Sequence, residues 1–356
     1  MIKLKKHLLI VTSWTVIGLI LTVYDYLTIS SLSSAGFSEG YDLKSSLLLN
    51  GSVGFAAGVL GGGVLVYYVN ERYRDGPYWK SIALVIVSFI LVSSSLVVIV
   101  SLVWALQKSN SVGFTESFTA FLGDSIHLKN AMAWLIVLVL TQLTLQVNDK
   151  FGQNNWINFL LGKYHRAKEE TRIFLFVDLN SSTRIAERLG NETYHRFLKE
   201  YFTDITGPIV DHSGEIYQYV GDEVIISWML SQKGRNDDCL KCYFAMSGVF
   251  TGLADKYLLK YGFVPEFKAG VHFGKVIVGE IGVIKRELTL SGDVLNTTSR
   301  ILGMCNEHQV RILASDELLA ILPNDGFYQK IPLGDMELRG KAEKVGISTL
   351  KLSGIF

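Results

Sequence analysis

Two aspartates stand where a carboxylate can do chemistry. Asp178 ends a short apolar run, TRIFLFVDL, that has strand character, and Asp222 lies in a Gly-Asp turn between two further strand-like runs. If the first and third strands are neighbours in one sheet, these carboxylates converge. Such a pair suits Mg²⁺, and two metal ions can hold the attacking and leaving oxygens of a phosphoryl transfer. Exposed turn aspartates are more often simple turn formers, so the residues alone leave both interpretations open.

The elements around these aspartates alternate between strand and helix from residue 171. We expect a strand over 171–179, a long helical stretch over 182–210, a hairpin over 215–229 and a helix over 236–259. A strand pair over 267–282, a further strand over 287–292 and a helix that opens at Asp293 are expected to follow. The leading order, strand–helix–strand–strand–helix–strand, predicts a ferredoxin-like α+β sheet. A fold of this kind does not by itself give a function.

The first half of the chain is different, because it is strongly apolar and carries few charges. Four stretches are long enough to cross about 30 Å of hydrocarbon as helices, roughly 8–28, 46–69, 81–106 and 131–147. We therefore expect a four-helix transmembrane bundle over 1–147, a linker helix over 148–170 and a soluble domain over 171–356.

The short loops predict an orientation for these spans. Basic residues precede the first span, lie between the second and third, and follow the fourth, whereas the other two loops carry fewer: Lys3, Lys5 and Lys6; Arg72, Arg74 and Lys80; Lys150, Lys163, Arg166 and Lys168. Because positive residues stay inside, both termini and the soluble domain are expected in the cytoplasm. A cleaved signal peptide is the weaker interpretation of the first span, since three more spans follow.

Glycines in the second span are spaced for close helix packing. Gly54, Gly58 and Gly62 follow one another at intervals of four, which lets another helix approach. That helix could belong to the same bundle or to a second copy of the chain, and the sequence does not decide between them.

Charge and cysteine content exclude other classes. The net charge of +1 gives no indication of a nucleic-acid partner. Three cysteines, Cys239, Cys242 and Cys305, do not form a secreted disulfide framework, and the lone CxxC among them lacks a second pair for zinc. We expect ordinary buried or half-buried cysteines.

Several motifs of the soluble half together resemble one family. FVDLNSST (176–183), YQYVGDEVI (217–225), AGVHFGKVIVGEIG (269–282), LTLSGDVLNTTSRI (288–301) and ELRGK (337–341) are similar to the motifs of class III nucleotidyl cyclases, in that family's order and spacing. The resemblance covers roughly residues 170–352, about half of the chain. The stretch before the first motif is similar to bacterial members that carry a membrane domain, which implies the bacterial cytoplasmic (inner) membrane.

The resemblance implies roles at the centre of the reaction. Asp178 and Asp222 would bind two Mg²⁺ or Mn²⁺ ions, with help from the carbonyl of Leu179. Asn296 would orient the ribose and Arg300 would stabilise the pentavalent phosphate. The chemistry agrees, since these last two residues lie four apart at a helix start and a triphosphate needs cations in its transition state.

The resemblance also implies substrate contacts. Lys275 matches an arginine that contacts the terminal phosphates, and Arg339 matches a phosphate-binding lysine, with Lys341 as an alternative. The two base-reading positions are Gln218 and Thr289. Family adenylyl cyclases often have Lys and Asp there and guanylyl cyclases Glu and Cys, so this pair leaves the choice of base open.

Taken together, the sequence predicts a nucleotidyl cyclase that converts ATP to 3′,5′-cyclic AMP and pyrophosphate at a homodimer interface and is controlled through its membrane domain. The alternatives are a guanylate cyclase, or a membrane receptor whose cyclase-like domain binds nucleotide without turnover. The expected partners are a nucleoside triphosphate, a second copy of the chain and the lipid bilayer.

Overall fold

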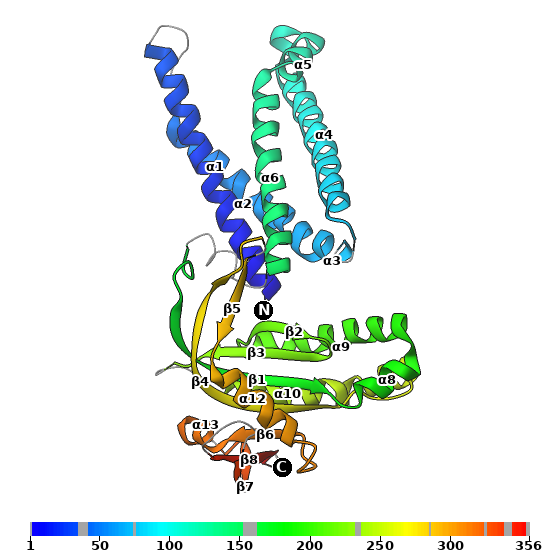
Figure 1. Cartoon of the computed structure of the whole chain (residues 1–356). Helices are drawn as coiled ribbons and strands as arrows, with labels where there is room; N and C mark the ends of the chain where they lie inside the picture. The colour runs from blue at the N-terminus through cyan, green and yellow to red at the C-terminus, as the bar shows by residue number, and fades with distance from the viewer. Residues whose placement is uncertain are drawn as a thin grey trace. The chain divides into compact units, whose positions relative to one another are not determined.

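The computed structural model describes residues 2–34, 42–73, 76–151, 162–231, 236–284, 286–323, 326–337 and 344–353. The chain divides into two compact units, residues 1–152 and 153–356. The described elements of the first unit are all helices, and the second unit is a mixed sheet with helices (Figure 1).

The N-terminal unit consists of long apolar helices. In chain order they are α1 (Ile2–Ser34), α2 (Leu43–Gly63), the π-helical segment η1 (Val64–Val69), α3 (Asn70–Arg72), α4 (Tyr78–Val112), α5 (Phe114–Leu122) and α6 (Ser125–Phe151). Four stretches within them are long and apolar enough to span a bilayer, and each contains one predicted span: Lys3–Ser31, Leu43–Arg72, Tyr78–Leu106 and Phe114–Asn148. The sequence did not predict the separate short helix α5.

The glycine face of α2 packs against α1 of the same chain. A Cβ atom at Gly54 would lie 2.7 Å from the carbonyl oxygen of Trp14, and one at Gly58 would lie 2.7 Å from the Cα of Val11. Only glycine permits backbones to approach this closely. The interpretation in which these glycines contact a second chain is therefore wrong for this face, which is already occupied within the bundle.

The second unit is built on one sheet with the strand order β2-β3-β1-β4-β6-β8-β7, and β5 pairs with β4 (Figure 1). The strands are β1 (Lys168–Leu179), β2 (Glu215–Val220), β3 (Glu223–Met229), β4 (Phe267–Ile281), β5 (Glu287–Ser291), β6 (Ile312–Ser315), β7 (Tyr328–Glu337) and β8 (Lys344–Leu352). The first four strands pair antiparallel in the ferredoxin-like order, which confirms the predicted fold class.

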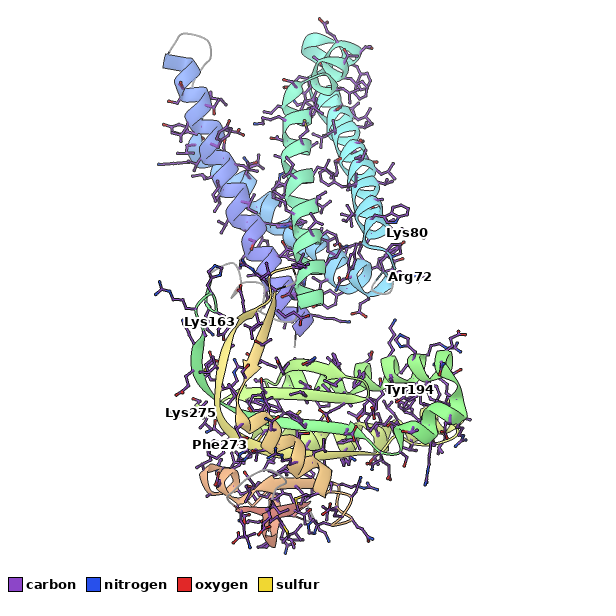
Figure 2. The ribbon with its side chains drawn as sticks, viewed as in Figure 1. Arg72, Lys80, Lys163, Tyr194, Phe273 and Lys275 are labelled. Atoms are coloured by element: carbon purple, nitrogen blue, oxygen red, sulfur yellow. The ribbon has the colours of Figure 1, made fainter. Side chains whose placement is uncertain are left out.

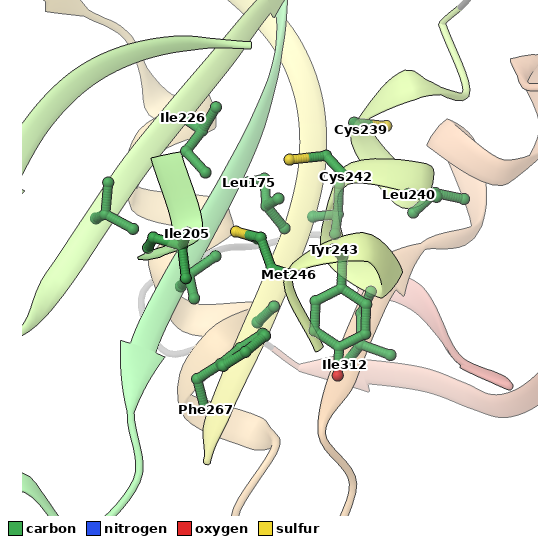
Figure 3. Packing of buried hydrophobic residues seen from close by; sticks show 14 of the residues in the cluster. Leu175, Ile205, Ile226, Cys239, Leu240, Cys242, Tyr243, Met246, Phe267 and Ile312 are labelled. Carbon is green, nitrogen blue, oxygen red and sulfur yellow. The ribbon is translucent and has the colours of Figure 1, made fainter. Parts of the chain in front are cut away.

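Helices α8 (Ser182–Leu189), α9 (Asn191–Asp211), α10 (Asp238–Gly252) and α11 (Ala254–Tyr261) accompany these strands. The main core lies between α9, α10 and one face of the sheet, where Leu175, Ile205 and Met246 are fully buried (Figure 3). Cys239 and Cys242 are free and buried in this core, as predicted. The core fixes the face of β1 that does not carry Asp178.

Three local expectations were wrong. Residues 267–282 form one long strand, β4, and not a strand pair, because no turn interrupts the antiparallel pairing with β1. The long helical stretches are divided, at Gly190 with φ of +72° and again at Leu253. The linker helix does not reach residue 170, since β1 begins at Lys168, and residues 152–161 lie outside the described part of the chain.

The opposite face of the sheet is covered by α12 (Asp293–Met304), while α13 (Asp316–Ile321) follows β6. Two glycines of β4 bring α12 close. A Cβ at Gly270 would lie 2.6 Å from the backbone nitrogen of Leu302, and one at Gly274 would lie 3.0 Å from the Cβ of Val294. The sheet and α12 are thus held at a fixed separation, with Thr298 buried between them.

Candidate active site

The two predicted carboxylates meet where β1 ends and β3 begins. Asp178 is the cross-strand partner of Glu223 in the antiparallel pairing of these strands, and Asp222 immediately precedes Glu223. The turn that presents Asp222 depends on Gly221, whose φ of +64° favours glycine. Asp178 and Asp222 are both half-buried. The convergence expected from the sequence is therefore confirmed.

Burial and neighbouring charges raise the pKa values of several groups around this site. Partial burial raises the pKa of Asp178, hydrogen bonding to Lys268 opposes this shift, and the charge of Asp222 adds to it. Burial, together with the charges of Asp178 and Asp222, raises the pKa of Glu223 to about 7. Burial and then the charge of Asp222 also raise the pKa of Tyr194 on α9. The site thus concentrates negative charge that a cation would relieve.

Lys268 supplies a cation at this place, and sequence reasoning missed it. It is the cross-strand partner of Asp178 on β4, and its Nζ lies 3.1 Å from a carboxylate oxygen of Asp178. Because directly paired residues share a face, Asp178, Glu223 and Lys268 lie together on one face of the sheet. The sequence of β4 gave no distinctive signal for Lys268, because the same strand also carries Lys275 and Glu280.

Lys275 is not brought to the two aspartates. It pairs with Thr171, seven residues along β4 from Lys268, or about 23 Å at the rise of a strand. Its Nζ lies 2.8 Å from Glu169. Figure 2 shows Lys275 and Tyr194 toward opposite ends of the sheet. The structure therefore does not bring Lys275 together with Asp178 and Asp222, because a sequence motif does not give the register of β4 on β1.

The loop after Asp178 is held in an unusual conformation. Leu179 anchors it, with a side chain only 2% exposed in the main core. The N–H of Asn180 donates to the carbonyl of Glu266 at 2.8 Å, and Ser181 then adopts a left-handed conformation with φ of +58° before α8 begins. Backbone strain of this kind concentrates at functional sites. The metal contact of the Leu179 carbonyl stays a prediction.

The residues at this site fit a magnesium or manganese ion bound together with a phosphate substrate. Mg²⁺ is usually held by one or two carboxylates, with substrate phosphates and water as the other ligands. Asp178 and Asp222 are such a pair. Among the residues that the structure describes, no three His, Cys, Asp or Glu side chains are grouped as a complete metal site. A cation here would therefore depend on oxygens from the substrate.

Asn296 and Arg300 lie on the side of α12 that points away from the sheet. The sheet-facing positions are Val294 and Thr298, and each predicted residue is two positions further on, about 200° around the helix. Asn296 is exposed, whereas Arg300 is half-buried and its Nη1 is enclosed without a hydrogen-bond partner in the described structure. Asp178 of the same chain lies on this sheet, so Asn296 and Arg300 face away from the sheet that bears it.

The strands that carry Gln218 and Thr289, the two residues predicted to contact the base, are linked through a tyrosine. Tyr217, next to Gln218 on β2, accepts a hydrogen bond at its hydroxyl from the N–H of Leu290, at 3.2 Å. Leu290 follows Thr289 on β5, and the Thr289 hydroxyl donates to the carbonyl of Gly279. The structure therefore brings the strands that carry Gln218 and Thr289 together. Arg339 and Lys341 lie outside the described residues.

A profile of the adenylate and guanylate cyclase catalytic domain matches residues 164–351, more than half of the chain. The chain therefore belongs to the adenylate and guanylate cyclase family.

Individual relatives agree with this assignment. The chain is 32% identical over 206 residues to adenylate cyclase 2 of Rhizobium meliloti (strain 1021), a match that covers 58% of this chain and 57% of the relative. It is 26% identical over 220 residues to an adenylate cyclase of Anabaena cylindrica, covering 58% of this chain and 43% of that protein. The chain thus spans about half the length of these relatives.

A solved structure supports the fold. A bacterial light-regulated adenylyl cyclase superposes with a TM-score of 0.52 at 17% identity, over 62% of this chain and 65% of the other. At this identity the likeness concerns the fold alone.

The contrast between the two lysines leads to a stability prediction. Lys268→Met leaves three crowded carboxylates without their cation, so it should lower the free energy of unfolding of the metal-free chain by about 1–3 kcal/mol. Lys275→Met removes only an exposed ion pair and should change it by less than about 0.5 kcal/mol. Thermal unfolding with and without millimolar Mn²⁺ measures this, and Mn²⁺ should recover part of the Lys268→Met loss. Equal effects of the two substitutions would contradict the assigned register.

Proposed function

We propose that this protein is a membrane-anchored adenylate cyclase, which converts ATP to 3′,5′-cyclic AMP and pyrophosphate. The observation that carries the proposal is the meeting of Asp178 and Asp222 at one strand end, beside Lys268, in a chain of the cyclase family. The adenylate cyclases among its relatives support ATP as the substrate.

The reaction joins two parts of one nucleotide. The ribose 3′-oxygen attacks the α-phosphorus, the bond from that phosphorus to the pyrophosphate oxygen breaks, and the hydroxyl proton leaves to water or to the substrate. Asp178 and Asp222 would hold two Mg²⁺ or Mn²⁺ ions, which supply charge neutralisation at the phosphates when bound. Lys268, and not Lys275, lies beside these carboxylates and would contact the terminal phosphates.

The rest of the site comes from a second copy of the chain. Asn296 would orient the ribose and Arg300 would offset the charge that develops at the α-phosphate. Both lie on the side of α12 that faces away from the sheet bearing Asp178. A two-fold dimer would place this side against the partner's carboxylates and form two equivalent sites.

Membrane attachment gives the proposal its cellular setting. The four apolar helices and the basic loops support a multi-pass protein of the bacterial cytoplasmic membrane with both termini inside. The membrane helices would hold two copies close, which raises the local concentration of their catalytic units. Because Gly54 and Gly58 pack within one chain, the helix faces that join two copies must lie elsewhere on the bundle.

The base specificity is expected to favour ATP only moderately. An amide both donates and accepts, so Gln218 can serve N1 and N6 of adenine or turn to serve guanine. With Mn²⁺ and either nucleotide, the full-length protein should release 3′,5′-cyclic AMP, with kcat/KM for ATP above that for GTP by less than about 10³. A ratio that favours GTP would make the protein a guanylate cyclase, and no turnover of either nucleotide would refute catalysis.

Complementation tests the shared sites. Asp178→Ala and Asn296→Ala chains should each be inactive, and a mixture that exchanges subunits should regain activity, because one site of the heterodimer carries both lesions and the other carries none. A mixture of Asp178→Ala with Asp222→Ala is the matched control and should stay inactive, since each of its sites lacks one carboxylate. If exchange is demonstrated and the first mixture also stays inactive, the shared-site model is wrong.

A further inference from the structure

A buried arginine in the first half of β1 links the turn at Tyr164 to the strand that carries Gln218. The Arg172 side chain is only 7% exposed. Its Nε donates to Glu170 at 2.8 Å, and its Nη1 donates to Glu215 at 2.7 Å and to the Ser227 hydroxyl at 3.0 Å. One guanidinium thus ties together β1, the first residue of β2 and β3.

Stability alone does not explain a buried guanidinium at position 172. Well-packed apolar residues often replace buried ion pairs without loss of stability, whereas removing one partner alone is costly. Burial disfavours the charged guanidinium, but Glu215 and Glu170 outweigh it and raise the pKa of Arg172. The planar guanidinium offers donors in a rigid fork, so it fixes the directions of both carboxylates as well as their distance.

On one side, the cluster reaches the turn through which the chain enters this unit. The Tyr164 hydroxyl donates to Glu170 at 3.1 Å, and the Tyr164 side chain is buried in the same hydrophobic cluster as Phe174 and Ile225. Lys163 lies over this ring, 4.8 Å from its centre. In sequence, Tyr164 follows the end of α6 at Phe151 by thirteen residues, and its turn is the first described segment of the second unit.

On the other side, the cluster reaches the base-reading pair. Glu215 opens β2, and the pairing of β2 with β3 shifts its register between Ile216 and Gln218. Tyr217 then receives the hydrogen bond from Leu290, next to Thr289. The Arg172–Glu215 contact therefore holds one end of the short, irregular strand that carries Gln218 and that contacts β5, the strand of Thr289, through Tyr217.

We propose that Arg172 is a positioning residue that ties the entry turn at Tyr164 to β2 and so sets how Gln218 and Thr289 meet the nucleotide base. This inference rests on the proposed cyclase function. Through this contact the membrane half could change nucleotide affinity and base selectivity without acting on Asp178 and Asp222, the proposed site of the chemistry.

The test separates binding from turnover in the full-length protein. Arg172→Met should raise KM for ATP about tenfold and change the ratio of kcat/KM for ATP over GTP by at least about fivefold, while kcat at saturating Mn²⁺ and ATP stays within about twofold. Arg311→Met is the matched control, because Arg311 pairs with Glu266 at 2.6 Å but is 63% exposed. The control should leave KM and the ratio unchanged.

Milder variants cover the case in which Arg172→Met does not fold. Tyr164→Phe removes only a hydroxyl, and Glu215→Gln keeps the shape of the side chain. Each should raise KM in the same direction, and their effects should be non-additive in the double variant, because both act through Arg172. Lower thermal stability or kcat with unchanged KM and ratio would show a merely structural role and overturn the proposal. Absence of ATP and GTP turnover in the unmodified protein would instead refute the cyclase function itself.

Discussion

The antiparallel pairing of β1 with both β3 and β4 is the constraint on which the site depends. It places Glu223 and Lys268 on either side of Asp178 and sets the Asp222 turn beside them. Several carboxylates in one half-buried place repel one another, and the salt bridge from Lys268 offsets only part of that repulsion. The sheet thus holds a concentration of negative charge that binding of a cation and a phosphate substrate would complete.

The same sheet explains why one chain is expected to be insufficient. Gly270 and Gly274 let α12 approach β4 closely, with Thr298 buried between them, which turns Asn296 and Arg300 away from Asp178. Because α12 packs on the sheet in this way, Asn296 and Arg300 do not reach Asp178 of their own chain. In the proposed dimer, a two-fold partner would complete the site without any new element, because each copy offers both surfaces.

Much of this architecture could be predicted from residue types and order. The ferredoxin-like arrangement, the convergence of Asp178 with Asp222 and the four apolar helices all follow from local patterns that period and turn chemistry determine. The positions of Lys268 and Lys275 relative to Asp178 could not be predicted in this way. They depend on the register of β4 on β1, and the sequence motif does not specify that register. The packing of Gly58 on Val11 likewise depends on which helix is the neighbour, and spacing alone does not specify it.

The most direct test of the carboxylate site measures cation binding without turnover. Electron paramagnetic resonance of Mn²⁺ titrated into the full-length protein, with an ATP analogue that cannot cyclise, counts bound ions and their affinity. The account predicts two Mn²⁺ ions per site in the unmodified protein and loss of tight binding in both Asp178→Asn and Asp222→Asn. Unchanged Mn²⁺ stoichiometry and affinity in the two variants would contradict the claim that these carboxylates form the metal site.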